Sequence, residues 1–220
     1  MDGIHDFGGK QGFGKVPVGR DYTPFHDRVD GLSLAIMMEC TFDWPLDRAR
    51  HVKELLPPIN YLADPYFTGW AMTYMVLLIE SGRLTAEEII SGQASGDPAT
   101  PARRTLPEVM ERNRISAERF DAPANNTPAF GIGDRINTAE HGKPGHTRLP
   151  AYARAKRGTI VAHHGTHVFP DEMALRRRVH DHLYTVAFDA RDLFGPDGTP
   201  GHEVLLDLWQ PYLTPAGEHP

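Results

Sequence analysis

The hydrophobic residues of this chain change their spacing close to Ala129, and that change constrains the fold more than any other feature. Upstream, apolar side chains recur every three or four residues in segments that end at proline or glycine, which is typical of amphipathic helices. Downstream, they occur in short runs of β-branched and aromatic residues with turn residues between them. We therefore expect an α+β fold with a mostly helical N-terminal part and a C-terminal β domain.

Prolines and glycines divide the helical part into segments. Leu32–Cys40 is apolar on nearly every side, which predicts a buried helix, and Leu46–Leu56 predicts the next one. Tyr66–Glu80 predicts a longer helix whose aromatic stripe is more often core than pocket wall. Two further helices are expected, one after a capping-box pattern at Thr85 and one over Leu106–Phe120.

The N-terminal stretch carries six glycines and two prolines within residues 1–30, and its apolar residues follow no helical or strand period. Such a stretch cannot build a core, and Phe7, Phe13 and Phe25 favour a segment that lies against another surface. The chain is therefore expected to have three parts: an extended arm over residues 1–30 that wraps a partner subunit, a helical domain over residues 31–122 with a linker near residues 92–104, and a β domain over residues 123–220.

The β domain is expected to be a small barrel, because its strands are few and short. The opening Gly133-Asp134, just before the first strand, resembles that of an SH3-like β-barrel. The expected strands lie within residues 130–136, 158–162, 183–188 and 204–209.

Composition excludes several classes of function. The formal charge of −6 argues against nucleic acid or an anionic membrane as the main partner, because those need a concentrated basic face. The single cysteine, Cys40, rules out an internal disulfide and cannot supply a thiolate-rich metal site. No apolar run approaches the ~20 residues that span a bilayer, so we expect a cytoplasmic protein.

Two arginines are candidates for recognising an anion with a planar set of donors. Arg148 lies between the turn residue Gly145 and Pro150, and the proline ring should stiffen the backbone beside it. Arg50 lies on a predicted helix with Glu54 four residues later, so Glu54 could hold its side chain. The alternative is a routine exposed ion pair worth about 0.3–0.5 kcal/mol.

A histidine-rich segment is the one cluster with the density of a metal site. On a strand, His163 and His167 would share a face while His164 opposes them, and Asp171 follows in the next turn. A turn and strand held by hydrogen bonds is the stronger interpretation. We therefore predict no metal site in this chain.

Several segments, taken together and in order, resemble the nitrile hydratase β-subunit family from end to end. They are residues 1–6, 50–61, 66–82, 133–134, 146–148, 167–171, 183–186 and 207–213. The resemblance implies an enzyme, a hydro-lyase that hydrates a nitrile to the corresponding amide and is active only with its α subunit. The implied assembly is an αβ heterodimer that pairs into a heterotetramer of two α and two β subunits.

In that family the metal is carried by a cysteine-rich loop of the α subunit, with two cysteines oxidised to sulfinate and sulfenate. The resemblance implies cobalt(III) more than iron(III), because the position of Trp70 tends to be tryptophan in cobalt enzymes and tyrosine in iron enzymes. The metal would then be bound by the α subunit and not by this chain.

Roles for individual residues also follow from the resemblance. Arg50 and Arg148 are similar to arginines that hydrogen-bond the oxidised cysteine oxygens. Glu54 matches a residue that positions this network, and Tyr66 matches one near the substrate or the attacking water. Three further positions match those that line the substrate pocket: Leu34, Leu46 and Trp70.

The chain departs from the family pattern at some positions. The family usually has Tyr-Tyr-Glu-His-Trp where this chain has Tyr66-Phe67-Thr68-Gly69-Trp70, so a histidine is replaced by Gly69. Two other interpretations stay open: a component of thiocyanate hydrolase, and a non-catalytic maturation protein that escorts the α subunit. The presence of both arginines and of all three parts in one chain favours the catalytic β subunit.

Overall fold

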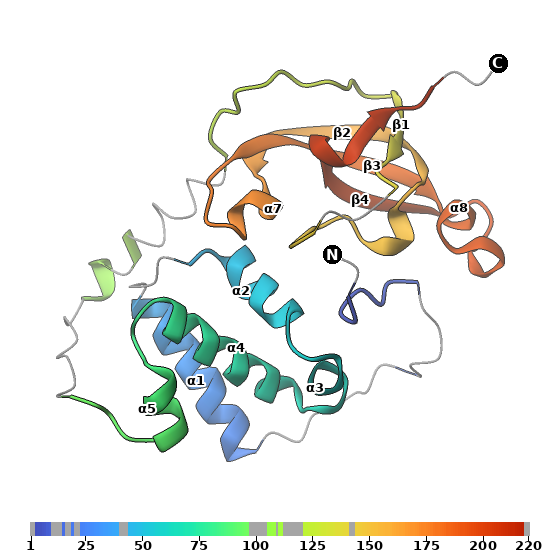
Figure 1. The fold of residues 1–220 in the computed structure, drawn as a ribbon. Coiled ribbons are helices and arrows are strands. Elements are labelled where there is room, and N and C mark those ends of the chain that lie inside the picture. The colour runs from blue at the N-terminus through green and yellow to red at the C-terminus, as the bar shows by residue number, and fades with distance from the viewer. Residues whose placement is uncertain are drawn as a thin grey trace. The chain divides into compact units, whose positions relative to one another are not determined.

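A computed structural model describes residues 3–9, 15, 19, 23–39, 44–96, 105–108, 110–111, 121–140 and 144–217. The chain divides into two compact units: residues 1–14 with 119–220, and residues 15–118. The first unit contains the sheet and the second contains the helices α1 to α5 (Figure 1). The helical unit is therefore interposed in the sequence of the β unit.

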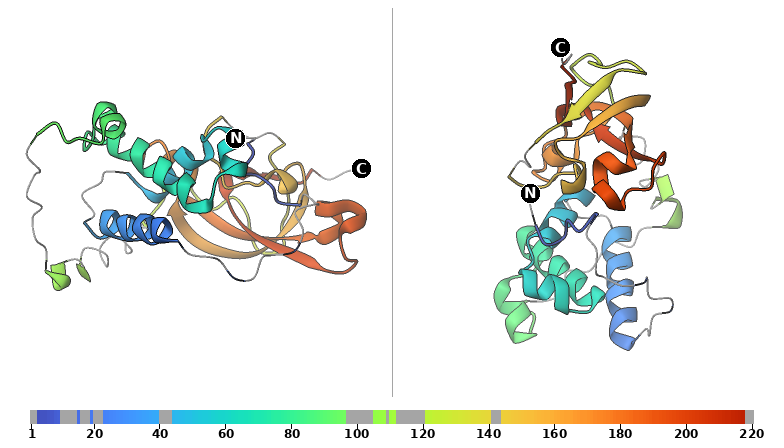
Figure 2. Two further views of the ribbon diagram at one scale, coloured as in Figure 1. Left: turned by 90° about the horizontal axis from the view of Figure 1, so that it is seen from below. Right: turned by 90° about the vertical axis from the view of Figure 1, so that its right-hand side faces the viewer.

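The helical unit is built from helices of six to sixteen residues. Its helices in the described residues are α1 (Pro24–Glu39), α2 (Leu46–Glu54), α3 (Pro58–Ala63), α4 (Tyr66–Glu80) and α5 (Ala86–Ser91) (Figures 1 and 2). Helix α4 has the bounds that the sequence predicts, whereas α3 was not expected. The helix predicted over residues 106–120 lies mostly outside the described residues.

Helix α1 begins at Pro24, inside the range predicted as an extended arm. Thr23 and His26 exchange hydrogen bonds at this end: His26 N–H donates to Thr23 Oγ1 at 3.5 Å, and Thr23 N–H donates to His26 Nδ1 at 3.2 Å. This is the pattern of a capping box with histidine in place of glutamate, and proline at the first helical position fits it. The Thr-Pro pair is thus a helix start that the sequence analysis missed.

Helix α1 is not buried on all sides, contrary to the prediction. Leu32 and Leu34 are 47% and 62% exposed in this chain, while Val29 and Ile36 are buried. A buried cluster joins α1, α2 and α4, and α4 supplies its centre because Leu77 is fully buried. The members of this cluster are Ile36, Ala49, Val52, Tyr74 and Leu77.

Helix α5 confirms the capping box that the sequence predicts. Thr85 Oγ1 accepts the N–H of Glu88 at 3.1 Å, and the Glu88 carboxylate accepts the N–H of Thr85 at 2.8 Å. The helix ends at Gly92, whose φ of 67° is left-handed. A glycine adopts that conformation without the steric cost of a side chain.

The β unit contains a five-stranded antiparallel sheet in the order β4-β3-β2-β1-β5. Its strands are β1 (Arg135–Thr138), β2 (Arg157–Val168), β3 (His180–Asp189), β4 (Glu203–Trp209) and β5 (Leu213–Pro215). Strands β4 and β5 lie at the two edges, so the sheet is open in the described residues. The α+β fold is thus confirmed, whereas closure into a barrel is not.

Strand β2 is long and irregular, and its irregularities bend the sheet. Its pairing with β3 shifts register between Ile160 and Ala162 and again between His163 and Thr166. Such bulges increase local twist and bend the strand, which lets one strand serve both parts of a curved sheet. The enclosed core contains Ile136, Leu149, Ile160, Phe169, Tyr184, Val186, Phe188, Leu208 and Tyr212.

Short helical segments connect the strands and complete the β unit. They are η1 (Ala151–Ala153), α7 (Pro170–Met173), α8 (Ala190–Phe194), η2 (Gly195–Asp197) and η3 (Gln210–Tyr212). None of the described helices in either unit has the length and apolarity needed to cross a membrane.

Residues 3–9 pack on the β unit of their own chain. The Asp6 carboxylate accepts the N–H of Ala151 at 2.8 Å and lies 3.5 Å from the guanidinium of Arg154. The backbone of Gly8 lies so close to the Tyr152 ring that an added Cβ would come within 2.4 Å of it. Glycine at this position therefore permits the N-terminal segment to lie flat on the ring.

Candidate functional site

Arg148 is attached to a backbone that is fixed by a buried hydroxyl group. Its N–H donates to the Tyr212 hydroxyl oxygen at 3.0 Å, and that hydroxyl donates in turn to the Asp171 carboxylate. Tyr212 and Asp171 are only 3% and 9% exposed. A buried, mutually hydrogen-bonded pair of this kind defines a single backbone position for Arg148.

The Tyr212 hydroxyl keeps its proton over a wide pH range. Burial raises the pKa of this phenol first, and the nearby negative charge of Asp171 raises it further. The phenol comes from η3, at the end of β4, and the carboxylate comes from α7, so two connections of the sheet converge on the Arg148 segment. The sequence analysis missed this arrangement because Tyr212 lies 64 positions from Arg148.

The residues that follow Arg148 are fixed as well. The side chain of Leu149 is buried, and its carbonyl accepts a hydrogen bond of 3.3 Å from Arg154 Nη2. Pro150 has φ −68° and ψ 150°, an extended conformation that leads directly into η1. The Arg148 side chain itself is exposed, so an outward-facing guanidinium sits on an immobilised backbone.

Arg50 lies on α2 and forms an ion pair within its own helix. Its Nη1 atom lies 2.9 Å from Asp47 Oδ1, three residues earlier, and 40% of its side chain is exposed. The sequence analysis expected Glu54 as its partner, but Glu54 Oε2 lies 3.5 Å from His51 Nδ1. Asp47 therefore holds Arg50 in this chain, and part of the guanidinium remains available to other groups.

Three aromatic residues of α4 form a continuous row. The Tyr66 and Trp70 rings meet edge to face with centroids 6.4 Å apart, and Trp70 stacks on Tyr74 at 5.8 Å. Tyr74 is buried, Trp70 is half-buried and Tyr66 is 56% exposed. The stripe therefore begins in the core and ends at the surface of the helical unit.

Lys53 extends from α2 onto this aromatic row. Its Nζ atom lies 4.3 Å from the Tyr66 ring centroid and 4.1 Å from that of Trp70. Burial lowers the pKa of the Lys53 amine. The sequence analysis did not consider Lys53, because a lysine on the polar side of an amphipathic pattern gives no signal of what it contacts.

Two of the three residues predicted to line a pocket, both leucines, are exposed in this chain. Leu34 of α1 is 62% exposed and Leu46 of α2 is 53% exposed. Together with Tyr66 they place apolar surface on the outside of the helical unit. Exposed apolar area of this kind is typical of a surface that binds a partner or ligand.

The predicted site residues thus fall into two groups. The helical unit holds Leu34, Leu46, Arg50, Glu54, Tyr66 and Trp70, and the β unit holds Arg148. Within the helical unit the structure brings Tyr66 and Trp70 into ring contact, and it places Arg50 and Glu54 on one short helix.

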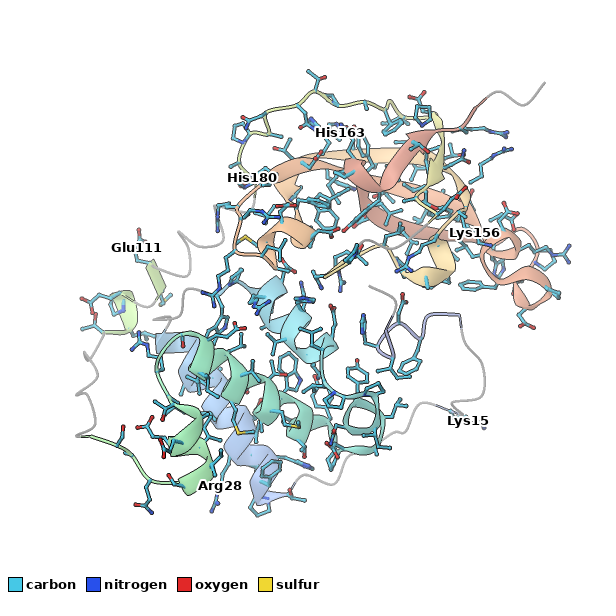
Figure 3. The ribbon with its side chains drawn as sticks, viewed as in Figure 1. Lys15, Arg28, Glu111, Lys156, His163 and His180 are labelled. Atoms are coloured by element: carbon cyan, nitrogen blue, oxygen red, sulfur yellow. The ribbon has the colours of Figure 1, made fainter. Side chains whose placement is uncertain are left out.

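The histidine-rich segment does not gather its side chains around one point. His163 Nε2 lies 3.1 Å from His182 Nδ1, and Figure 3 shows His163 on the sheet of the β unit. His164 Nε2 instead contacts Thr185 Oγ1 at 2.7 Å, and His167 Nε2 contacts the carbonyl of His164 at 3.2 Å. The described contacts therefore favour a segment held by hydrogen bonds over a metal site.

The whole chain is similar to one family of proteins. The family model "Nitrile hydratase beta subunit, N-terminal" matches residues 1–115, and the model "Nitrile hydratase beta subunit, C-terminal" matches residues 119–215. The chain is 35% identical over 225 residues to nitrile hydratase subunit beta of Pseudomonas putida, covering 98% of this chain and 100% of that protein.

Two relatives carry the metal in their names. The low-molecular weight cobalt-containing nitrile hydratase subunit beta of Rhodococcus rhodochrous is 32% identical over 226 residues, covering 98% of this chain and 100% of that protein. The cobalt-containing nitrile hydratase subunit beta of Pseudonocardia thermophila is 32% identical over 228 residues, covering 97% and 96%. Among solved structures, the recombinant apo-enzyme of thiocyanate hydrolase from Thiobacillus thioparus matches with a TM-score of 0.42 and 19% identity, covering 53% of this chain and 100% of that one.

Proposed function

We propose a function for this chain from one premise: it belongs to the nitrile hydratase β-subunit family. The relatives of this family at 31–35% identity span nearly the whole chain and are named as nitrile hydratase subunits. Nitrile hydratases are hydro-lyases that work as a complex. This chain is therefore the β subunit of an enzyme that hydrates a nitrile to an amide.

The partner in our proposal is an α subunit, first as an αβ heterodimer and then as a heterotetramer of two α and two β subunits. Large apolar side chains of the helical unit support a partner, because Leu34, Ile59 and Ile90 are 62%, 72% and 86% exposed. The N-terminal arm that we expect on the partner is shortened by the helix that starts at Pro24. Residues 3–9 support the β unit of this chain instead.

The metal in our proposal is bound by the α subunit. It is cobalt(III), with iron(III) as the less favoured alternative. Trp70 and the two relatives named as cobalt-containing support this choice. The bound ion would supply Lewis acidity that polarises the nitrile and lowers the pKa of a water. The residues of this chain suit a supporting role, since the two candidate arginines are donors and no ligand of the metal is required from them.

Arg50 and Arg148 are proposed to donate hydrogen bonds to the oxidised cysteine oxygens of the α subunit. Each guanidinium offers planar donors that match a pair of oxygens, and such charge-assisted bonds are about twice as strong as neutral ones. The observation that carries this proposal is the fixed backbone of Arg148. A buried Tyr212–Asp171 pair holds that backbone in one position, which suits an exposed arginine that must be aimed at a particular group. Asp47 orients the Arg50 side chain through their ion pair.

Glu54 and Tyr66 are proposed to serve the reaction from the helical unit. The Glu54 side chain is only 12% exposed and faces His51, which suits a carboxylate that positions its neighbours. The exposed phenol of Tyr66 is placed to orient the substrate or the attacking water. Leu34, Leu46 and Trp70 would provide the apolar wall against which the organic part of the nitrile packs.

We also propose that the sheet is that of an SH3-like β-barrel. The strand order β4-β3-β2-β1-β5, the bulged and bent β2 and the single turn η3 between β4 and β5 support this assignment. An experimental structure of the assembled complex tests it through the pairing at the two sheet edges.

The proposed function is tested by co-expression with the α subunit in medium that contains both cobalt and iron. We expect a complex that hydrates benzonitrile to benzamide and carries one cobalt per αβ pair. The chain purified alone should bind neither metal stoichiometrically and should be inactive. A metal-loaded, active β chain would contradict the assignment of the metal to the α subunit.

A further inference from the structure

Lys53 is an unusual cation because its amine is covered by two aromatic faces. Its Nζ atom lies 4.1 Å from the Trp70 centroid and 4.3 Å from the Tyr66 centroid, well within cation–π range. The electron-rich faces stabilise the positive charge on one side. The same contact fixes where the charge lies, because a lysine side chain in water would otherwise sample many rotamers.

Among the described residues, no carboxylate neutralises the charge of Lys53. Within the part of the chain that the structure describes, no Asp or Glu oxygen forms an ion pair with Lys53 Nζ, although Glu54 is its neighbour in sequence and faces His51. Burial of the amine makes an unneutralised charge costly, which is the physical cause of its lowered pKa. An anion that reached this amine would therefore be bound favourably.

Gly69 of α4 lies beside the stem of Lys53. A Cβ placed on Gly69 would lie 3.8 Å from Lys53 Cε and 3.6 Å from Leu56 Cδ1. Position 69 is therefore in ordinary packing contact with the lysine stem, next to the aromatic row.

We propose that Lys53 is a specificity-determining residue that selects nitriles carrying a carboxylate group. The proposal rests on the proposed function, because it takes Trp70 as part of the pocket wall and Tyr66 as a residue beside the bound nitrile. The carboxylate of the substrate would meet the ammonium group at the edge of the two rings. The ring faces would pack against the hydrocarbon part of the same molecule.

A small carboxylate suits this position better than a carboxylate of a partner protein. The amine is half-buried and framed by two rings, so the approaching oxygen must enter a restricted space. A substrate diffuses into such a space freely, whereas a side chain fixed on a folded surface must be aligned with it. A partner carboxylate is nevertheless a distinct outcome that the experiment separates.

The test compares 3-cyanobenzoate with its neutral isostere 3-nitrobenzonitrile in the assembled complex. Lys53→Met removes the charge at nearly constant length, and Lys53→Arg keeps both the charge and the ability to stack on the rings. Lys156→Met, in the β unit (Figure 3), is the matched control because it changes the net charge by the same amount. Steady-state kinetics and the αβ dissociation constant are measured for all four proteins.

We expect Lys53→Met to raise KM for 3-cyanobenzoate about tenfold, which corresponds to the loss of one favourable charge pair. Its kcat, and both constants for 3-nitrobenzonitrile, should change less than about twofold. Lys53→Arg should restore most of the lost affinity, and Lys156→Met should resemble the unmodified complex. These three results together support the proposal.

Other results overturn the proposal in distinguishable ways. Equal loss for both substrates would make Lys53 a structural residue, and weaker subunit association without a change in selectivity would assign the amine to a partner carboxylate. If the unmodified complex hydrates 3-nitrobenzonitrile and Lys53→Met leaves the ratio of KM for the two substrates unchanged, this inference fails while the proposed function stands. If the complex hydrates benzonitrile but neither of these two nitriles, only this inference fails, whereas a complex that hydrates no nitrile at all would refute both.

Discussion

The hydroxyl group of Tyr212 accepts the backbone N–H of Arg148 at 3.0 Å and donates its own proton to Asp171. The Tyr212 phenol thereby links three segments that lie between strands of the β unit: η3, α7 and the segment before η1. The contact is to the backbone of Arg148, so the identity of that side chain is irrelevant to it. The support and the proposed functional group are therefore separable by mutation.

Tyr212→Phe should lower both stability and turnover. The substitution leaves the buried Asp171 carboxylate and the Arg148 N–H each short of a partner, a cost of about 1–3 kcal/mol in the free energy of unfolding. A less firmly held Arg148 should lower kcat of the complex by roughly three- to tenfold. Urea unfolding of the chain and benzonitrile kinetics of the complex measure the two effects.

Tyr184→Phe is the matched control for that experiment. Tyr184 is fully buried in the same core, and its hydroxyl donates to Gln210 Oε1 at 3.0 Å. It should lose a similar amount of stability with kcat unchanged. Equal kinetic losses in the two variants would mean that Tyr212 acts only through the stability of the core.

Replacing either arginine by lysine should slow the enzyme without dissociating it. An ammonium group cannot reproduce the planar donors of Arg50 or Arg148, and losing such a charge-assisted bond in the transition state slows turnover roughly ten- to a hundredfold. Arg191→Lys, at an exposed position of α8, should leave kcat unchanged. Unaltered kcat in both site variants would refute the assignment of these arginines.

The stability of the β unit should decline as the pH falls below about 6.5, the pKa of an unperturbed histidine. Burial lowers the pKa of His163, and the neighbouring His182 and His164 lower it further. The unfolded chain therefore binds this proton more tightly than the folded chain, so protonation favours unfolding. The contribution is complete above the unfolded pKa and is lost as the pH falls through the folded one.

One of the two neighbouring imidazole rings, that of His182, contacts His163 directly. The Nε2 atom of His182 lies 3.0 Å from the carbonyl of Asn126 and must carry a proton, so its Nδ1 accepts from His163. Denaturant unfolding at pH 7.5 and pH 5.5 measures the difference, which should shrink in His163→Gln. His202→Gln, at an exposed position, should keep the pH dependence of the unmodified chain.

Gly158→Ala should destabilise the sheet. A Cβ at this position would lie 2.4 Å from Val186 Cγ1 and 3.1 Å from the carbonyl oxygen of Ala187, and Val186 is fully buried. Overpacking of this kind costs about 1–3 kcal/mol. Gly96→Ala is the control, because no atom lies within 4 Å of a Cβ at that position, and it should leave the urea midpoint unchanged. Equal midpoints for the two variants would show that β2 shifts to accept the extra methyl group without a loss of stability.

Local signals explain the parts of the fold that the sequence predicts well. The capping box at Thr85 and the period of Tyr66–Glu80 operate over a few residues, and α5 and α4 follow them closely. The start of α1 at Pro24 is also encoded locally, in Thr23 and His26, but histidine takes the place of the glutamate or glutamine that identifies a capping box in a sequence.

Contacts between distant segments explain what the sequence analysis missed. Arg50 has two acidic neighbours at helical spacing, and only packing decides that Asp47 rather than Glu54 pairs with it. The cover of Lys53 by Tyr66 and Trp70 depends on the angle at which α2 meets α4. Spacing and composition alone therefore decide neither the partner of Arg50 nor the contacts of Lys53.

The attachment of residues 3–9 to the β unit has a consequence during synthesis on the ribosome. Asp6 lies 145 positions before its partner Ala151, and the Phe194 ring against Gly9 is made later still. At about 5–20 residues per second, residues 3–9 wait on the order of ten to forty seconds for their binding surface. Residues 15–118 are synthesised before that surface is complete, so the helical unit can fold while residues 3–9 still lack the part of the β unit on which they pack.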